Sequence, residues 1–235
     1  MSGPARQAVI ITIDGPAGTG KSSVAHRLAE RLGLEFLDTG AMYRGAAMIA
    51  LDNGIAPDDG PALAAAVCRA GMQFVWTTDP PRLHLAGRNV SRRIRDLDVS
   101  EIVSIVAAQP PVREVLVEQQ RAIAAAHPRL VTEGRDQGSV VFPQAPVKFY
   151  LDAPAEVRAE RRIRQLVKAG KSVDEEQVRR DIAARDRLDS GRDLAPLIRP
   201  AGAIVVDTAD KSLTDVVDEL EAIVRERLPQ AEFAA

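Results

Sequence analysis

Short apolar runs alternate with stretches in which polar and apolar residues recur at helical spacing. After the first run, for example, Val24, Leu28 and Leu32 follow this spacing until Gly33 ends the pattern. A helical pattern follows each run within a few residues, and this alternation predicts an α/β fold with helices on both faces of a doubly wound, parallel, five-stranded sheet. The runs occupy residues 9–13, 34–37, 130–132, 147–151 and 204–206.

Residues 72–90 break this alternation. The strings "MQFVW" and "RLHLAGRNV" have strand character and are separated by the turn signal "TTDPP". We therefore expect a small antiparallel insertion at this point of the chain.

Composition limits the class of protein. A chain of 235 residues with 1 cysteine and a net charge of −2 is expected to be one domain, or one domain with insertions, without an intrachain disulfide. Near-neutral charge argues against a nucleic-acid-coating surface, so any anion site is local. Because the sequence shows no signal-peptide pattern and no membrane-spanning segment, we expect a cytoplasmic protein. We also expect a monomer whose partners are small-molecule substrates and neither nucleic acid nor membrane.

The loop after the first apolar run matches a phosphate-binding motif. In Gly15-x-x-x-x-Gly20-Lys21-Ser22, glycines let backbone N–H groups point into one concavity at a helix N-terminus, where the macrodipole favours an anion. We expect Lys21 to reach the β- and γ-phosphates of ATP and the Ser22 hydroxyl to bind Mg²⁺, whose waters Asp38 or Glu133 orients. The predicted ATP site comprises Gly15, Pro16, Ala17, Gly18, Thr19, Gly20, Lys21, Ser22 and Ser23.

The rest of the chain favours a small-molecule kinase among the proteins with this loop. A guanine-specific switch needs Asn-Lys-x-Asp, which does not occur, and motors and helicases bring further motifs. A kinase needs a second anion site for its acceptor, and arginine suits phosphate because its guanidinium binds bidentately. Four segments offer candidates, which are Asp38, Thr39 and Arg44; Ser104 and Arg113; Glu133, Arg135 and Asp136; and Arg185, Asp189 and Arg192.

Five strings resemble the bacterial cytidylate kinases in order and approximate spacing. They are "TIDGPAGTGKSS", "FLDTGAMYR", "EGRDQGSVVFP", "VKFYLDA" and "RDRLDSGRDLAPL", within residues 9–227. The resemblance implies transfer of the γ-phosphoryl group of ATP, with Mg²⁺, to CMP or dCMP in pyrimidine nucleotide metabolism. It also implies a role for each candidate: Thr39, Arg44, Arg135 and Arg192 hold the acceptor phosphate, Ser104, Arg113 and Asp136 read cytosine, and Arg185 and Asp189 hold the ribose.

The same resemblance implies a division of the chain by role. Residues 1–62 and 104–235 form the core, residues 63–103 bind the nucleoside monophosphate, and a helical lid lies at about 156–173. Its Arg158, Arg161 and Arg162 fold over the transferring phosphoryl group, so that Lys21, Arg135, Arg158, Arg162 and Arg192 form the catalytic set. The chain departs from the family pattern at Gln109, Pro111, Gln137 and Leu188.

Hydrogen-bond polarity favours cytosine. An ionised Asp136 only accepts and Arg113 only donates, which suits the amine and N3 of cytosine and mismatches uracil. Two alternatives stay open. One is a kinase for another acceptor, such as UMP, shikimate or a sugar acid, and the other is a binding protein that uses ATP as a conformational ligand.

Overall fold

The computed structural model describes residues 8–168, 170, 172–192 and 194–228. The chain divides into two compact units, one of residues 1–35 and 128–235 and one of residues 36–127. The predicted division by role stays a prediction, and its residues 1–7, 169, 171, 193 and 229–235 lie outside the described part.

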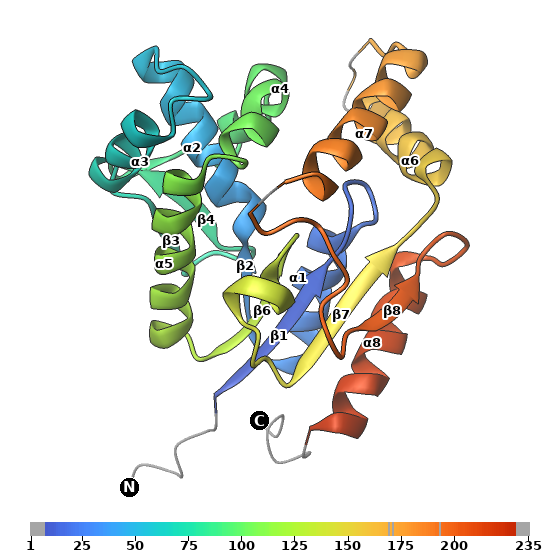
Figure 1. The fold of residues 1–235 in the computed structure, drawn as a ribbon. Coiled ribbons are helices and arrows are strands. Elements are labelled where there is room, and N and C mark those ends of the chain that lie inside the picture. The colour runs from blue at the N-terminus through green and yellow to red at the C-terminus, as the bar shows by residue number, and fades with distance from the viewer. Residues whose placement is uncertain (1–7, 169, 171, 193, 229–235) are drawn as a thin grey trace, which may run out of the picture. The chain divides into compact units, whose positions relative to one another are not determined.

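The parallel sheet confirms the predicted α/β class (Figure 1). Its five strands have the order β2-β6-β1-β7-β8. The strands are β1 (Val9–Asp14), β2 (Glu35–Asp38), β6 (Arg129–Gly134), β7 (Val147–Asp152) and β8 (Ile204–Asp207).

The central strand β1 forms the core of the larger unit. It pairs in parallel with β6 and β7, where Ile13 lies opposite Glu133 and Phe149. Ile11, Ile13 and Phe149 are fully buried, as their β-branched or aromatic side chains favour. Because all strands of the sheet are parallel, the loop that follows β1 lies at the carboxyl end of the sheet, where ligands of open α/β sheets bind. Since β1 is the central strand, this loop lies in the middle of that end.

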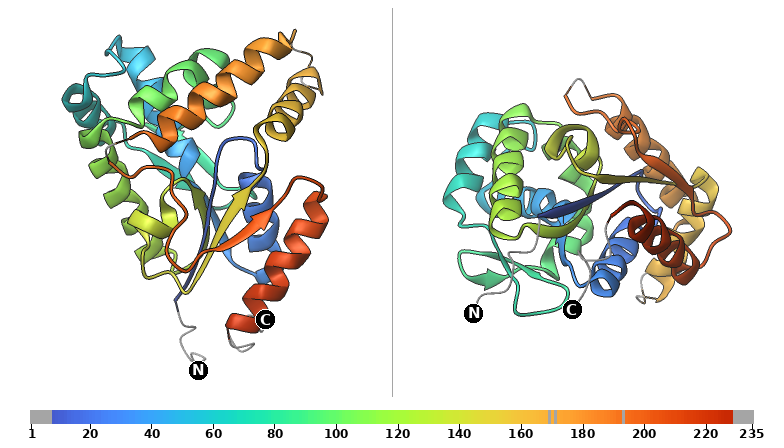
Figure 2. Two further views of the ribbon diagram at one scale, coloured as in Figure 1. Left: turned by 45° about the vertical axis from the view of Figure 1, so that its right-hand side comes forward. Right: turned by 90° about the horizontal axis from the view of Figure 1, so that it is seen from below.

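Helices of the larger unit cover the sheet unequally (Figure 2). On one face α1 (Lys21–Leu32) packs beside α8 (Leu213–Arg227). On the other face lies η2 (Gln137–Val141), one turn of π-helix against β1 and β6. The remaining helices, α6 (Ala155–Lys168) and α7 (Glu175–Ser190), pack against each other.

The expectation of a helical pattern after every strand is wrong for β6, which is followed by η2 alone. The reason is a tertiary contact, since the Asp14 carboxylate accepts hydrogen bonds from the N–H groups of Gln137 and Gly138. A Cβ added at Gly138 would lie 2.8 Å from Thr12 Oγ1, so the turn packs closely on β1.

The smaller unit contains the predicted antiparallel insertion. Its three-stranded sheet has the order β3-β4-β5, with His84 opposite Gln73 and Asn89. Directly after β3, the Trp76 ring stacks on His127 with centroids 4.0 Å apart. Its elements are α2 (Thr39–Asn53), α3 (Gly60–Arg69), β3 (Gln73–Val75), β4 (Arg82–Leu85), β5 (Arg88–Asn89), η1 (Arg93–Arg95), α4 (Leu97–Val106) and α5 (Pro110–Ala126).

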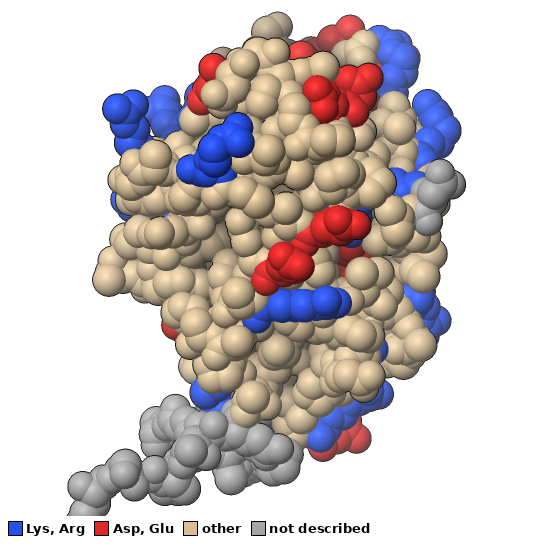
Figure 3. Space-filling view, turned by 60° about the vertical axis from the view of Figure 1, so that its left-hand side comes forward, with Lys and Arg blue, Asp and Glu red and all other residues tan. Residues whose placement is uncertain are grey.

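Charged side chains on the face drawn in Figure 3 are of both signs and are interspersed among uncharged residues. None of the helices in the described part of the chain has the length and hydrophobicity that crossing a bilayer requires.

Candidate active site

Glycine shapes the loop between β1 and α1. Gly15, Gly18 and Gly20 have φ angles of 149°, 85° and 89°, a region that L side chains rarely adopt. A Cβ at Gly15 would also lie 2.1 Å from the carbonyl oxygen of Leu151 on β7. Gly20 is the N-cap of α1 and has no side chain to cap the helix, so the first turn presents its N–H groups to an anion.

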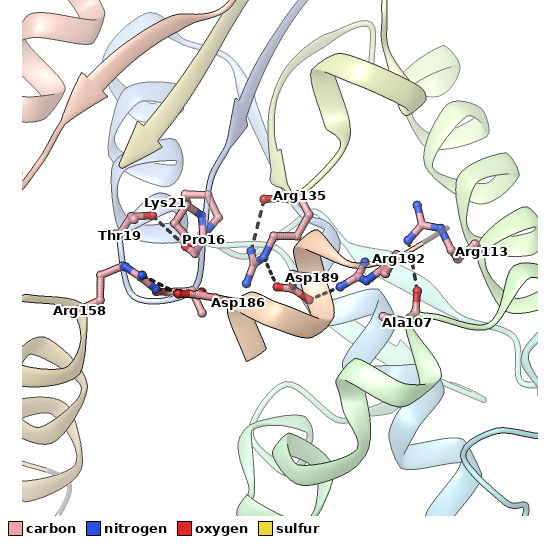
Figure 4. A network of polar contacts seen from close by, with 12 residues as sticks. Pro16, Thr19, Lys21, Ala107, Arg113, Arg135, Arg158, Asp186, Asp189 and Arg192 are labelled. Carbon is pink, nitrogen blue, oxygen red and sulfur yellow. Dashed lines mark hydrogen bonds and ion pairs between the residues drawn. The ribbon is translucent and has the colours of Figure 1, made fainter. Parts of the chain in front are cut away.

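Lys21 is the first residue of α1, directly after this loop, and its surroundings suit an anionic ligand (Figure 4). Its side chain is buried, and Nζ donates a hydrogen bond to the carbonyl oxygen of Pro16 at 2.8 Å. Burial, and after it the charge of Arg135, lowers the pKa of Lys21 from 10.5 to about 7. A phosphate would favour the charged form, because it supplies the negative charge that the buried ammonium needs.

Ser22 contacts one of the two carboxylates predicted to orient Mg²⁺ waters. Its Oγ donates a hydrogen bond to Glu133 Oε1 at 2.7 Å. In the smaller unit, Asp38 caps α2 by accepting from the N–H of Ala41 and pairs with Arg95 at 3.1 Å. Within the described residues, no three His, Cys, Asp or Glu side chains gather to hold a metal. A hydroxyl and a single carboxylate nevertheless fit Mg²⁺, which commonly takes its other ligands from phosphates and water.

A cluster of buried charges joins the turn after β6 to the end of α7. Asp189 accepts a hydrogen bond from Arg135 Nε at 2.8 Å through one oxygen and from Arg192 through the other. Burial raises the pKa of Asp189, but the charges of Arg135, Arg192 and Arg185 outweigh burial and hold the pKa below its ordinary value.

This cluster places two arginines on one carboxylate. The Nε atom of Arg192 is buried and finds no hydrogen-bond partner among the described residues. A buried cation with an unused donor is costly, and an anionic group would satisfy it. The cluster therefore suits the acceptor phosphate that a kinase requires.

Asp14 supports the turn that carries Arg135 and Asp136. Its oxygens accept hydrogen bonds from the N–H groups of Gln137 at 2.8 Å and Gly138 at 2.7 Å. Burial nonetheless raises the pKa of Asp14 from 3.8 to about 6. Since Asp14 also directly precedes Gly15, one carboxylate connects the start of the phosphate-binding loop to this turn.

The departure at Gln137 has a structural explanation. Its side chain is fully buried, where an unpaired amide would be costly. Thr132 Oγ1 donates to Gln137 Oε1 at 2.9 Å, and Gln137 Nε2 lies 3.5 Å from Asp136 Oδ1. Gln137 is therefore accommodated as a polar neighbour of Asp136.

The arginines predicted for the lid differ in their surroundings. Arg158 is buried and pairs with Asp186. Arg161 donates to Thr208 Oγ1 at 3.0 Å and to two carbonyl oxygens of the loop after β8. Arg162 is partly exposed. Their predicted contact with a phosphoryl group stays a prediction.

The smaller unit carries the other predicted acceptor residues. Arg44, on α2, donates to Ser100 Oγ at 2.8 Å. Arg113, on α5, is buried, donates to the carbonyl oxygen of Ala107 at 3.3 Å and lies over the Tyr43 ring at 5.6 Å. Thr39 and Ser104 are buried as well. Burial of polar groups of this kind is typical of binding sites and of internal hydrogen-bond networks alike.

The structure thus brings Arg135, Asp189 and Arg192 together, as it does Ser22 and Glu133. Arg185 and Asp189 both lie on α7, about one helical turn apart. Sequence reasoning missed Asp14 and Asp186. The position of Asp14 directly before the loop was a signal for it, whereas the partner of Asp186 is 28 residues away.

Comparison with known proteins identifies relatives over almost the whole chain. The cytidylate kinase family model matches residues 11–226. The cytidylate kinase of Nocardia farcinica (strain IFM 10152) is 46% identical over 222 residues, which cover 94% of this chain and 95% of that protein. The cytidylate kinase of Geobacter sp. (strain M21) is 42% identical over 234 residues, 99% of each chain.

A solved structure supports the fold alone. The crystal structure of a gluconokinase from Sinorhizobium meliloti 1021 superposes with a TM-score of 0.50 at 17% identity, over 95% of both chains.

Proposed function

The chain belongs to the cytidylate kinase family of ATP-dependent phosphotransferases, and we propose that it phosphorylates CMP and dCMP with ATP and Mg²⁺. The observation that carries this proposal is the part-buried Arg135–Asp189–Arg192 cluster, with two arginines on one buried carboxylate and an unused donor on Arg192. It gives the larger unit an anion site in addition to the phosphate-binding loop. A kinase whose acceptor is itself a phosphate needs both.

In the proposed donor site, ATP binds to residues 15–23. Lys21 leaves Pro16 and pairs with the β- and γ-phosphates, while backbone N–H groups of the loop bind the other phosphate oxygens. The Ser22 hydroxyl and, through water, Glu133 would hold Mg²⁺, which would neutralise charge on the phosphates. Catalysis is then mainly positioning and charge neutralisation, to which we assign Lys21, Arg135 and Arg192, with Arg158 and Arg162 from the lid.

In the proposed acceptor site, the residues sort by the part of the nucleotide they bind. Arginine forks match the phosphate and an ionised carboxylate matches the cytosine amine, so uracil meets partners of the wrong polarity. We assign the phosphate to Thr39, Arg44, Arg135 and Arg192, the ribose to Arg185 and Asp189, and the base to Ser104, Arg113 and Asp136.

In the proposed enzyme, two segments move when the nucleotides bind. Residues 63–103 and a lid at about 156–173 close over the bound nucleotides and exclude water, which suppresses ATP hydrolysis. The enzyme acts as a cytoplasmic monomer in pyrimidine nucleotide metabolism.

An acceptor panel tests this function. Initial rates of ADP formation are measured with CMP, dCMP, UMP and AMP at saturating ATP and Mg²⁺. We expect CMP and dCMP to be preferred over UMP by a factor on the order of 10⁴ in kcat/KM, because a buried mismatch leaves polar groups unpaired. Equal rates with UMP or AMP would contradict the proposal, and ATP binding without acceptor-stimulated turnover would favour a binding protein.

The variant Asp136→Asn tests whether Asp136 selects the base. Asp136→Asn creates an amide that both donates and accepts, so it should lose CMP activity and reduce the CMP:UMP ratio of kcat/KM. Asp58→Asn, at an exposed position of the smaller unit, is the matched control. An unchanged ratio in Asp136→Asn would leave base reading to Ser104 and Arg113.

A further inference from the structure

Arg158 contacts the phosphate-binding loop and not only its own helix. Its Nε donates to the carbonyl oxygen of Ala153 at 2.9 Å, and Nη1 donates to the carbonyl oxygen of Ala17 at 3.1 Å. A Cβ added at Gly18 would lie 3.0 Å from Arg158 Cβ, so the loop packs directly on α6 at this residue. Arg158 thus connects the first lid helix to the main chain of the loop.

Asp186 determines how Arg158 lies (Figure 4). Its two oxygens accept hydrogen bonds from Arg158 Nη1 at 3.0 Å and Nη2 at 2.6 Å, while the Arg158 side chain is only 6% exposed. A bidentate guanidinium–carboxylate pair fixes the plane of the guanidinium as well as its distance. With that plane fixed, the same guanidinium can point Nη1 at Ala17.

Two aspartates one turn apart on α7 therefore hold three arginines. Asp186 binds Arg158 at the phosphate-binding loop, and Asp189 binds Arg135 and Arg192. The acceptor arginines and the donor loop are in this way attached to the same helix.

We propose that Asp186 is a positioning residue for the donor site, which acts by holding Arg158 against the carbonyl group of Ala17 and so fixes the loop for ATP. The inference rests on the proposed function only in taking residues 15–23 as the ATP site. It requires no contact between Asp186 and the nucleotide.

ATP binding without acceptor tests the inference directly. The dissociation constant of ATP·Mg²⁺ is measured by titration calorimetry for the wild type and for Asp186→Asn, which keeps the shape but removes the charge. Loss of a charge-assisted pair should weaken ATP binding roughly tenfold. Asp181→Asn, an exposed position on the same helix, should bind ATP as the wild type does.

Kinetics separate positioning from a general structural effect. We expect Asp186→Asn to raise KM for ATP while KM for CMP changes less than twofold, and Asp186→Glu to recover part of the loss. Arg158→Lys should weaken ATP binding similarly, and combining it with Asp186→Asn should add little, because both remove the same pair.

Three results would overturn the inference. They are unchanged ATP binding in Asp186→Asn, equal increases in both KM values, and tighter ATP binding, which would mean that Asp186 keeps Arg158 away from the nucleotide. If Asp186→Asn does not fold, Asp186→Glu and Arg158→Lys decide by the same criteria. A wild type that binds ATP but does not phosphorylate CMP would contradict the proposed function and leave this test intact.

Discussion

Asp14→Asn tests whether burial raises the pKa of the Asp14 carboxyl group, which lies next to the phosphate-binding loop. Burial raises the pKa of Asp14 from 3.8 to about 6, against the two hydrogen bonds from Gly138 and Gln137. At about 1.4 kcal/mol for each pH unit, the difference corresponds to about 3 kcal/mol between the protonated and ionised forms. An asparagine keeps one accepting oxygen, but its NH₂ group would face an N–H donor.

The sign of the pH dependence follows from linkage. The folded protein binds this proton more tightly than the unfolded chain does, so the contribution of Asp14 to the free energy of unfolding is greatest below pH 3.8. It is lost as the pH rises towards 6. Between pH 4 and pH 7 this loss amounts to about 2 kcal/mol for the wild type, whereas the amide of Asp14→Asn does not titrate.

Urea unfolding followed by far-UV circular dichroism measures the effect. The free energy of unfolding of the wild type minus that of Asp14→Asn should fall by about 2 kcal/mol from pH 4 to pH 7. Taking the difference cancels the titration of groups that do not interact with Asp14, and Asp58→Asn serves as a control for loss of an exposed charge. A difference that stays constant within about 0.5 kcal/mol over this range would refute the reasoning.

Three further predictions concern the site. Lys21→Ala should abolish turnover and leave the melting temperature close to that of the wild type, because the buried ammonium matters to the transferring phosphate and not to the core; a near-native rate would contradict the loop assignment. Arg44→Ala and Arg192→Ala should lower kcat/KM for CMP by a factor that corresponds to roughly 2–4 kcal/mol of transition-state stabilisation, and should lower kcat/KM for ATP much less. Equal losses for both substrates would exclude the two arginines as acceptor ligands. Gly15→Ala should destabilise the fold by roughly 3 kcal/mol or more and abolish ATP binding, because its Cβ would overlap a β7 carbonyl group, whereas Gly33→Ala, with nothing within 4 Å, should cost about 1 kcal/mol in urea unfolding.

The predictable parts of this molecule depend on local patterns. Short apolar runs located the strands of the sheet, and Gly33, in the left-handed conformation at the end of α1, ended its helix where expected. The glycine spacing of residues 15–20 located the phosphate-binding loop. In each case neighbours in the sequence are also neighbours in space, so periodicity and residue type carry the information.

The parts that were missed depend on distant partners. The turn η2 replaces a longer helix because Asp14, more than 120 residues earlier, accepts from its first N–H groups. The pairing of Arg135 with Asp189 spans 54 residues, so the sequence offered both as candidates without showing that they touch. A buried Gln137 departs from the family pattern, and only the structure shows that Thr132 satisfies it.

The stack of Trp76 on His127 has a practical consequence. The chain contains 1 tryptophan, and it lies in the unit of residues 36–127. Indole fluorescence therefore reports on that unit alone, while far-UV circular dichroism reports on both. Superimposable unfolding curves from the two signals would show that the units lose structure as one cooperative block, and separated midpoints would give each unit its own stability.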